Sequence, residues 1–316
     1  MKGRLKVWPK SSEMSALCKN MQHVPVLLHE TIEGLNLKPG AVVVDGTLGA
    51  GGHSSEIARA YGKDVTIIGF DLDQDALDLA VNAIETAGGK LIPIHANFRT
   101  IKNALNEKGI KTIDGAMLDL GISSMEIGES GRGFSFKYDE PLLMTLQNPI
   151  ESDTLTARDV VNSTREEELA NIIFQFGEER FSRMIAKAIV VARRVHKIET
   201  TGELAEIIKN AVPGFYRNGR INPATKTFQA LRIYVNDELG AVTEGLQGAW
   251  NMLAPGGRIA VITFHSLEDR IVKNFFRDIP KEHKILHTKK PIVPTRAEVI
   301  RNPRSRSAKL RIIEKL

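Results

Sequence analysis

The stretch Val42-Val43-Val44-Asp45-Gly46-Thr47-Leu48-Gly49-Ala50-Gly51-Gly52-His53-Ser54 decides the expected fold. A run of β-branched residues predicts a buried strand, four glycines in seven positions predict a tight turn, and a helical pattern begins near Ser54. Glycines in such a turn let the backbone approach a ligand, and the following helix presents free N–H groups. A plain strand-to-helix turn has the same pattern, so this stretch alone leaves both interpretations open.

A second buried strand is predicted over 66–71, and it ends in a carboxylate, Asp71. An acidic residue there can accept hydrogen bonds from both hydroxyls of a ribose, as in doubly wound nucleotide sites. The glycines depart from the dinucleotide pattern G-x-G-x-x-G, because a match starting at Gly49 requires glycine where the chain has Ser54. The turn therefore favours a methyl donor such as S-adenosyl-L-methionine over a dinucleotide.

Composition restricts the class of protein. The 316 residues suffice for one large domain or two modest ones, and 42% apolar with 26% charged residues is typical of a soluble globular protein. No apolar run approaches the roughly 20 residues that span a bilayer, and the polar, basic residues 1–22 resemble a flexible extension rather than a secretory signal. The single cysteine, Cys18, excludes intrachain disulfides and cysteine-rich metal sites. We expect a cytoplasmic protein without a membrane partner.

Positive charge is concentrated at one end of the chain. The formal net charge is +5, but residues 281–316 alone carry +8 and residues 1–280 carry −3. A basic segment of this kind favours a polyanion partner such as RNA, although a solvated tail has the same composition.

Strands alternate with helices in the first part of the chain, with further strands predicted over 91–95 and 113–120. This alternation indicates a doubly wound, mostly parallel α/β sheet, which binds ligands at the carboxyl ends of its strands. The segments expected at that edge are Gly49–His53, Asp71, Asn97-Phe98 and Asp119.

The next strand is predicted only at 258–264, preceded by a crossover helix over 224–253. The roughly 90 residues over 131–221 are therefore more than a normal connection between the fourth and fifth strands needs. Ser163-x-x-Glu166 and Thr200-x-x-Glu203 both match capping boxes, so the excess is expected to be helical. We predict a discontinuous core over 23–130 and 222–316, and an inserted helical RNA-substrate domain over 131–221.

One helix of the insert is predicted over 179–196. Its apolar side includes Val195, and the opposite side gathers Arg180, Arg183, Lys187 and Arg194. These cations form either a plain solvated face or a stripe that tracks RNA phosphates.

The segment Asp119-Leu120-Gly121-Ile122-Ser123-Ser124 follows the fourth strand, where a methyltransferase holds its target base. Exocyclic amines are poor nucleophiles because their lone pair is delocalised into the ring. Catalysis therefore needs a hydrogen-bond acceptor on the N–H and in-line placement against the donor methyl. Asp119 with Ser123 or Ser124 could hold the amine, and a strand-end cap is the alternative role.

Several blocks resemble the MraW family of small-subunit ribosomal RNA methyltransferases. The match runs in order from about residue 23 to 316, and the blocks Arg132–Phe136 and Phe264–Val272 are highly specific. The matching segments are His23–Leu28, Asp45–Thr47, Gly51–Ser54, Asp119–Ser124, Arg132–Phe136, Gly177–Phe181, Pro223–Ile233, Phe264–Val272 and Asn302–Ser307.

The resemblance implies methyl transfer from S-adenosyl-L-methionine to N4 of a cytidine in the decoding region of small-subunit (16S) rRNA. It also implies a Rossmann-like class I methyltransferase core with an inserted helical domain. Phe98 would lie against the adenine and Asp71 would bind the ribose. Asp119 would contact the cofactor, a role that competes with its assignment to the amine. The cofactor residues carried over by position are Gly51, Gly52, His53, Asp71, Phe98, Asp119 and Glu126, the last replacing the family's usual glutamine.

His265 follows the fifth strand and faces the same sheet edge, so we assign it to substrate positioning, with a hydrogen-bonded loop residue as the alternative. No second His or Cys stands at metal-ligand spacing, and no metal is expected. The residues assigned to RNA are Arg132, Phe134, Arg180, Arg232, Arg270, Arg304 and Arg306.

Two segments depart from the family pattern: Met125–Gly128 replaces Pro-Gln-Leu-Asp, and Leu143–Leu146 replaces Asp-Met-Arg-Met. A ribosome-assembly factor that binds rRNA without turnover is therefore the alternative function, and a nucleotide-dependent oxidoreductase is opposed by Ser54. The partner is either free rRNA or the assembled small subunit, and a homodimer is left open.

Overall fold

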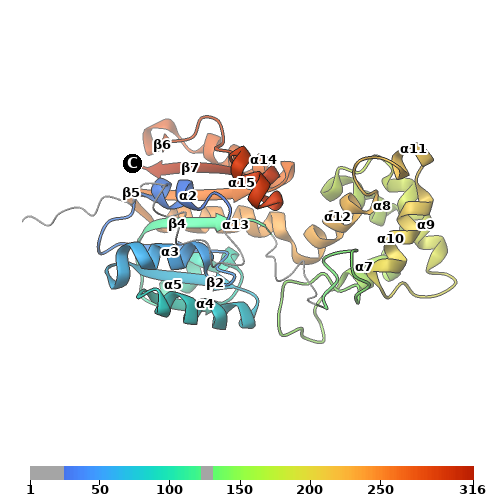
Figure 1. Cartoon of the computed structure of the whole chain (residues 1–316), viewed down its shortest axis with the longest axis horizontal. Helices are drawn as coiled ribbons and strands as arrows, with labels where there is room; N and C mark the ends of the chain where they lie inside the picture. Colours follow the sequence, from blue (N-terminus) through green and yellow to red (C-terminus); the bar gives the residue numbers. More distant parts are fainter. Residues whose placement is uncertain (1–24, 122–130) are drawn as a thin grey trace, which may run out of the picture. The chain divides into compact units, whose positions relative to one another are not determined.

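The computed structural model describes residues 25–121 and 131–316, and the chain divides into two compact units. Of these residues, the first unit combines 25–121 with Thr243–Leu316, and the second comprises 131–242 (Figure 1). The predicted extension over 1–22, and Ser123, Ser124 and Glu126, lie outside the described residues.

The first unit is built on a seven-stranded sheet in the order β3-β2-β1-β4-β5-β7-β6. The β1, β2, β3, β4 and β5 strands pair in parallel, whereas β7 runs antiparallel to β5 and to β6. This confirms the predicted Rossmann-like, mostly parallel doubly wound sheet. The strands are β1 (Val42–Asp45), β2 (Thr66–Asp71), β3 (Lys90–His95), β4 (Ile113–Asp119), β5 (Leu253–Thr263), β6 (Lys284–Leu286) and β7 (Lys309–Lys315).

Both faces of this sheet are covered, which explains the nearly continuous apolar runs of its strands. In β1, for example, Val43 and Val44 point to opposite faces and both are fully buried. The helical elements outside the second unit's own helices are α2 (Leu28–Leu35), α3 (Gly52–Tyr61), η2 (Gly62–Asp64), α4 (Gln74–Thr86), η3 (Phe98–Thr100), α5 (Ile101–Glu107), α13 (Glu238–Met252), α14 (Ser266–Asp278), η4 (Lys281–His283), α15 (Arg296–Arg301) and η5 (Pro303–Ser307).

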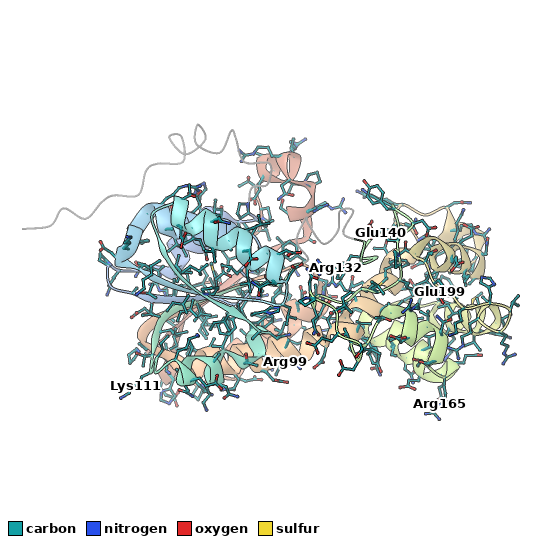
Figure 2. All side chains as sticks on the ribbon, turned by 90° about the horizontal axis from the view of Figure 1, so that it is seen from below. Arg99, Lys111, Arg132, Glu140, Arg165 and Glu199 are labelled. Atoms are coloured by element: carbon teal, nitrogen blue, oxygen red, sulfur yellow. The ribbon has the colours of Figure 1, made fainter. Side chains whose placement is uncertain are left out.

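The second unit is helical and has a hydrophobic core of its own. Its helices are α7 (Ala157–Ser163), α8 (Glu166–Gly177), α9 (Ser182–Ala192), α10 (Thr201–Ala211), α11 (Gly214–Arg217) and α12 (Ala224–Asn236). The loop before α7 is ordered by Glu140, whose buried carboxylate accepts hydrogen bonds from Gly131 N at 3.2 Å and Gly133 N at 2.9 Å. Figure 2 labels Glu140 beside this loop, together with Arg132.

The predicted crossover helix over 224–253 is two helices. α12 ends at Asn236, and Asp237 takes a left-handed conformation with φ 45° before α13 begins. α12 packs on α8, so this helix belongs to the second unit. The second compact unit ends at Val242, within α13, whereas the sequence analysis placed the end of the inserted domain at residue 221.

One of the two predicted capping boxes is wrong. α7 continues to Ser163, whose hydroxyl donates back to the Asp159 carbonyl at 2.5 Å, and α8 starts without a side-chain cap. The other box is confirmed: Thr200 and Glu203 cap α10 reciprocally. A third box, which the sequence analysis missed, joins Thr156 to Asp159 at the start of α7.

The helix predicted over 179–196 is shorter than expected, because α9 covers only Ser182–Ala192. Val195 lies beyond its end and is 84% exposed, so its assignment to the apolar side was wrong. Arg183 and Lys187 are exposed on α9, whereas Arg180 and Arg194 lie outside the helix. The four cations therefore do not share one helical stripe.

No helix within 25–121 and 131–316 is both long and apolar enough to cross a bilayer.

Replacing Thr200 by alanine should lower the free energy of unfolding by about 1 kcal/mol, because Thr200 Oγ1 accepts the Glu203 N–H at 3.3 Å. Ser163→Ala is the matched control, since this hydroxyl caps no helix start, and it should change the free energy by less than about 0.5 kcal/mol. Urea unfolding followed by far-UV circular dichroism measures both. Equal losses in the two variants would contradict the assignment of the caps.

Candidate active site

Three neighbouring strands of the first unit each end in an aspartate: Asp45 on β1, Asp71 on β2 and Asp119 on β4. The turn after β1 is bonded to both flanking strands. Thr47 Oγ1 accepts the Asp119 N–H at 2.6 Å, and Asp71 Oδ2 accepts the Gly49 N–H at 2.8 Å. The expected convergence of these segments at one sheet edge is therefore observed.

The glycines of the turn differ in what surrounds them. A Cβ on Gly51 would lie 3.1 Å from the Ala80 Cβ of α4, and one on Gly52 would lie 2.6 Å from Pro25 Cγ. Gly49, with φ +50°, has no heavy atom within 4 Å of that position among the described residues. Gly51 and Gly52 are thus needed for packing, and Gly49, which the sequence analysis did not single out as a contact, offers the open approach to the backbone.

Asp45 is buried beneath this turn and holds it in place. Asp45 is only 3% exposed, and its carboxylate accepts hydrogen bonds from Ser54 Oγ at 2.6 Å and Thr47 N at 3.1 Å. Burial raises the pKa of Asp45 to about 6; the two hydrogen bonds oppose this shift, and the charge of Asp71 adds to it.

Asp119 carries the largest shift at the edge. Burial, followed by the negative charges of Asp45 and Glu268, raises the pKa of Asp119 to about 7. Its side chain is 29% exposed, yet its Oδ1 atom is buried and has no hydrogen-bond partner among the described residues. An unpaired buried carboxylate oxygen is costly unless a ligand supplies the missing donor.

His53 approaches Asp119 from the start of α3. Its Nε2 lies 3.1 Å from the Val26 carbonyl and its Nδ1 lies 3.9 Å from Asp119 Oδ2. Because a carbonyl only accepts, Nε2 carries the hydrogen, and Nδ1 is the nitrogen that faces the carboxyl group. This contact brings together two residues that the sequence analysis assigned to the cofactor.

Asp71 is half-buried, and each of its oxygens accepts one backbone hydrogen bond, from Gly49 N at 2.8 Å and Asp73 N at 2.9 Å. Burial raises its pKa, against the effect of these bonds. A carboxylate oxygen has two lone pairs, so both oxygens retain acceptor capacity for hydroxyl groups.

Phe98 begins η3 directly after β3, and Asn97 caps this turn by accepting the Arg99 N–H at 3.0 Å. The ring packs against α13, where a Cβ on Gly245 would lie 2.4 Å from Phe98 Cδ2. Phe98 Cβ lies 3.1 Å from the Cβ position of Gly46 in the β1 turn. The half-buried ring is therefore fixed beside the carboxyl edge.

His265 caps α14. Its Nδ1 accepts the Glu268 N–H at 3.4 Å, and Glu268, which is 1% exposed, accepts the Phe264 N–H at 2.8 Å. The alternative role of a hydrogen-bonded loop residue is thus realised in the structure, and a contact of His265 with substrate remains a prediction.

The residues assigned to RNA are in different environments. Arg270 on α14 and Arg304 and Arg306 on η5 are exposed in the first unit, and Arg180 is exposed in the second. Phe134 is only 8% exposed and belongs to the core of the second unit, which gives it a packing role.

Two of the assigned arginines bind protein groups. Arg232 forms a two-pronged ion pair with Glu238, at 2.7 and 2.8 Å. Arg132 donates to the Leu146 carbonyl at 3.3 Å and lies 5.5 Å from the Phe134 ring centroid. These partners order the second unit, and they could not be predicted from the sequence because each contact depends on how the chain turns between the two residues.

Comparison with known proteins identifies the family. The profile described as the MraW methylase family matches residues 20–316. The protein named Ribosomal RNA small subunit methyltransferase H of Carboxydothermus hydrogenoformans is 48% identical over 312 residues, covering 93% of this chain and 98% of that protein. The protein of the same name from Deinococcus radiodurans is 48% identical over 309 residues, covering 98% of this chain and 95% of its own.

The match extends over both units and nearly the full chain. It makes this chain a methyltransferase that uses S-adenosyl-L-methionine, in place of the nucleotide-dependent oxidoreductase that the sequence analysis also considered. This chain belongs to the MraW methylase family.

Proposed function

We propose that this chain transfers a methyl group from S-adenosyl-L-methionine to N4 of a cytidine in the decoding region of small-subunit (16S) rRNA. The names of the curated relatives support the substrate class. The observation in the molecule that carries the proposal is Asp119, whose Oδ1 atom lies at the edge where three strands end and has no hydrogen-bond partner among residues 25–121 and 131–316.

The residues at this edge fit the cofactor. Gly49 provides open backbone, Asp71 retains acceptor capacity for two ribose hydroxyls, and the Phe98 ring is fixed where an adenine can stack. The backbone at Gly51 and Gly52, together with His53, is assigned to the amino-acid end. When bound, the cofactor supplies an electrophilic methyl group on a positively charged sulfonium, which suits an edge lined by carboxylates.

Asp119 is assigned to the amine of the cytidine. Its Oδ1, which is unpaired within the described part of the chain, would accept one N–H and so orient the nitrogen toward the methyl group. As the N–C bond forms and the C–S bond breaks, the nitrogen becomes cationic and must lose a proton. A carboxyl group with a pKa near 7 can accept that proton at neutral pH.

Other residues hold the substrate. Ser123 and Ser124 remain proposed partners of the amine, and Glu126 remains a proposed cofactor contact. His265 would position the base from the start of α14. The exposed cations assigned to RNA phosphates are Arg180, Arg183, Lys187, Arg270, Arg304 and Arg306.

Incubating the chain with tritiated S-adenosyl-L-methionine and small ribosomal subunits tests the proposal. We expect label in the rRNA that digests to N4-methylcytidine. Label on another nucleoside would contradict the N4 assignment. Binding to subunits without any incorporation would instead favour the assembly factor without turnover.

Asp71→Asn should weaken cofactor binding by about 1.5–3 kcal/mol, since it removes the charge and one acceptor that face the ribose. Calorimetry with S-adenosylhomocysteine measures the change. Asp64→Asn is the matched control, because this exposed aspartate precedes the opposite end of β2. Equal affinity in both variants would refute the ribose assignment.

The rate of methyl transfer should rise with pH and level off above about 7, because Asp119 accepts a proton only when ionised. Asp119→Asn should lower kcat by about 10²-fold or more and remove this rise. Single-turnover rates between pH 5.5 and 8.5 provide the measurement. A wild-type profile that is flat through pH 7 would contradict the role.

Stability provides a second test of Asp119 that does not depend on turnover. The raised pKa means that the folded state keeps a proton which the unfolded state loses, so this group's contribution to stability falls as pH rises from about 4 to about 7. Asparagine has no proton to lose. Asp119→Asn should therefore unfold at a Tm higher by about 2–4 °C at pH 8, and this advantage should shrink toward pH 5.

A further inference from the structure

The second unit carries an arginine surrounded by three aromatic rings. The guanidinium carbon of Arg180 lies 4.7 Å from the centroid of Phe181, 5.0 Å from Tyr216 and 5.6 Å from Phe215. The rings also contact one another edge to face, with Phe181 4.8 Å from Tyr216 and 6.2 Å from Phe215. We call these four residues the Arg180 cluster.

A buried acid, Glu179, is hydrogen-bonded to two residues of the cluster. Glu179 is fully buried, accepts the Phe181 N–H at 2.9 Å and accepts the Tyr216 hydroxyl at 2.5 Å. Burial, with the hydrogen bond to Glu179 and its charge, raises the pKa of Tyr216 to about 12. The phenol therefore stays neutral and bonded, which fixes two of the three rings before any ligand arrives.

The top of the cluster is exposed. Phe215 is 71% exposed, and the Arg180 side chain also lies at the surface. An exposed phenylalanine held against a guanidinium presents a flat apolar face beside a positive charge. That combination suits an unpaired nucleobase, which stacks on the ring, and its phosphate, which the arginine attracts.

The surrounding charge favours a polyanion. The two segments that form the cluster, residues 178–183 and 214–226, contain five cations and two carboxylates, Glu178 and the buried Glu179, and Glu206 of α10 interacts with one of these cations, Arg217. The Glu179 charge is already used by the hydrogen bonds described above. The cations are Arg180, Arg183, Arg217, Arg220 and Lys226.

We propose that the Arg180 cluster is a stacking platform for an unpaired base of the RNA substrate, with Phe215 as its contact face. The proposal rests on the RNA substrate proposed above and adds the site at which the second unit grips a single-stranded segment. It differs from the phosphate stripe expected on α9, because recognition here depends on the base as well as on its charge.

Phe215→Ala tests the platform directly, with Phe174→Ala as the matched control. Phe174 is a similarly exposed phenylalanine, 59% exposed on α8 in the same unit and outside the cluster. With a fluorescein-labelled single-stranded RNA oligonucleotide, Phe215→Ala should raise Kd roughly 5- to 150-fold, the range given by the loss of one base-to-ring stack. Phe174→Ala should leave Kd unchanged, and both variants should bind S-adenosylhomocysteine as the wild type does.

An abasic oligonucleotide separates stacking from charge. It keeps the phosphates but lacks bases, so the wild type and Phe215→Ala should bind it equally. Phe215→Trp should retain RNA affinity and lose tryptophan fluorescence when the base-containing RNA is added, whereas Phe174→Trp should not. Arg180→Lys keeps the charge without the planar group, and it should weaken binding to the base-containing RNA more than to the abasic RNA.

Equal RNA affinity of Phe215→Ala and the wild type would overturn the platform. So would a loss of binding to assembled subunits with naked RNA binding intact, because the face would then contact a protein. These results are separable from the fate of the proposed function. If the wild type transfers methyl groups but Phe215→Ala binds RNA as tightly as the wild type, only the platform is refuted. If the stacking is observed but no methyl group is transferred, only the enzyme assignment is refuted.

Discussion

The structure depends on how three carboxylates are accommodated at one edge of a sheet. Asp45, Asp71 and Asp119 end adjacent strands, and burial raises the pKa of each. Asp45 accepts hydrogen bonds from the β1 turn and from Ser54 of α3, and Asp71 accepts one from the turn, whereas Asp119 keeps one oxygen without a partner among the described residues. A cationic cofactor and an amine substrate would offset the buried negative charge and supply the hydrogen bond that Asp119 lacks among the described residues. The electrostatic cost of burying these carboxylates and the chemistry proposed for the edge therefore have the same origin.

The parallel sheet and its functional edge could be predicted from sequence because they follow from local patterns. Runs such as Val42–Val44, which consist of β-branched residues and end in a polar residue, are typical of a strand covered on both faces. Contacts between elements could not be predicted in this way. Nothing local reveals that Gly52 is a glycine because Pro25 packs against it, or that Gly49 alone in the turn has open space.

The errors in the helical unit have related causes. Ser163 and Glu166 have the spacing of a capping box, but whether a hydroxyl caps the next helix or bonds back into its own depends on where the first helix ends. A helical wheel likewise placed Arg180 and Val195 on a helix that covers only Ser182–Ala192. Their environments are set by tertiary contacts, which for Arg180 come from the distant residues Phe215 and Tyr216.

The interruption of the first unit by the second imposes an order of assembly during synthesis. β4 pairs with β5, and β5 with β7, so the sheet needs strands that leave the ribosome only after the whole helical segment. The helical unit is continuous in the chain and has its own core, so it can fold before β5, β6 and β7 have been synthesised. Until then the β4 edge exposes unpaired backbone, which makes the nascent chain most prone to aggregation just before its last quarter emerges.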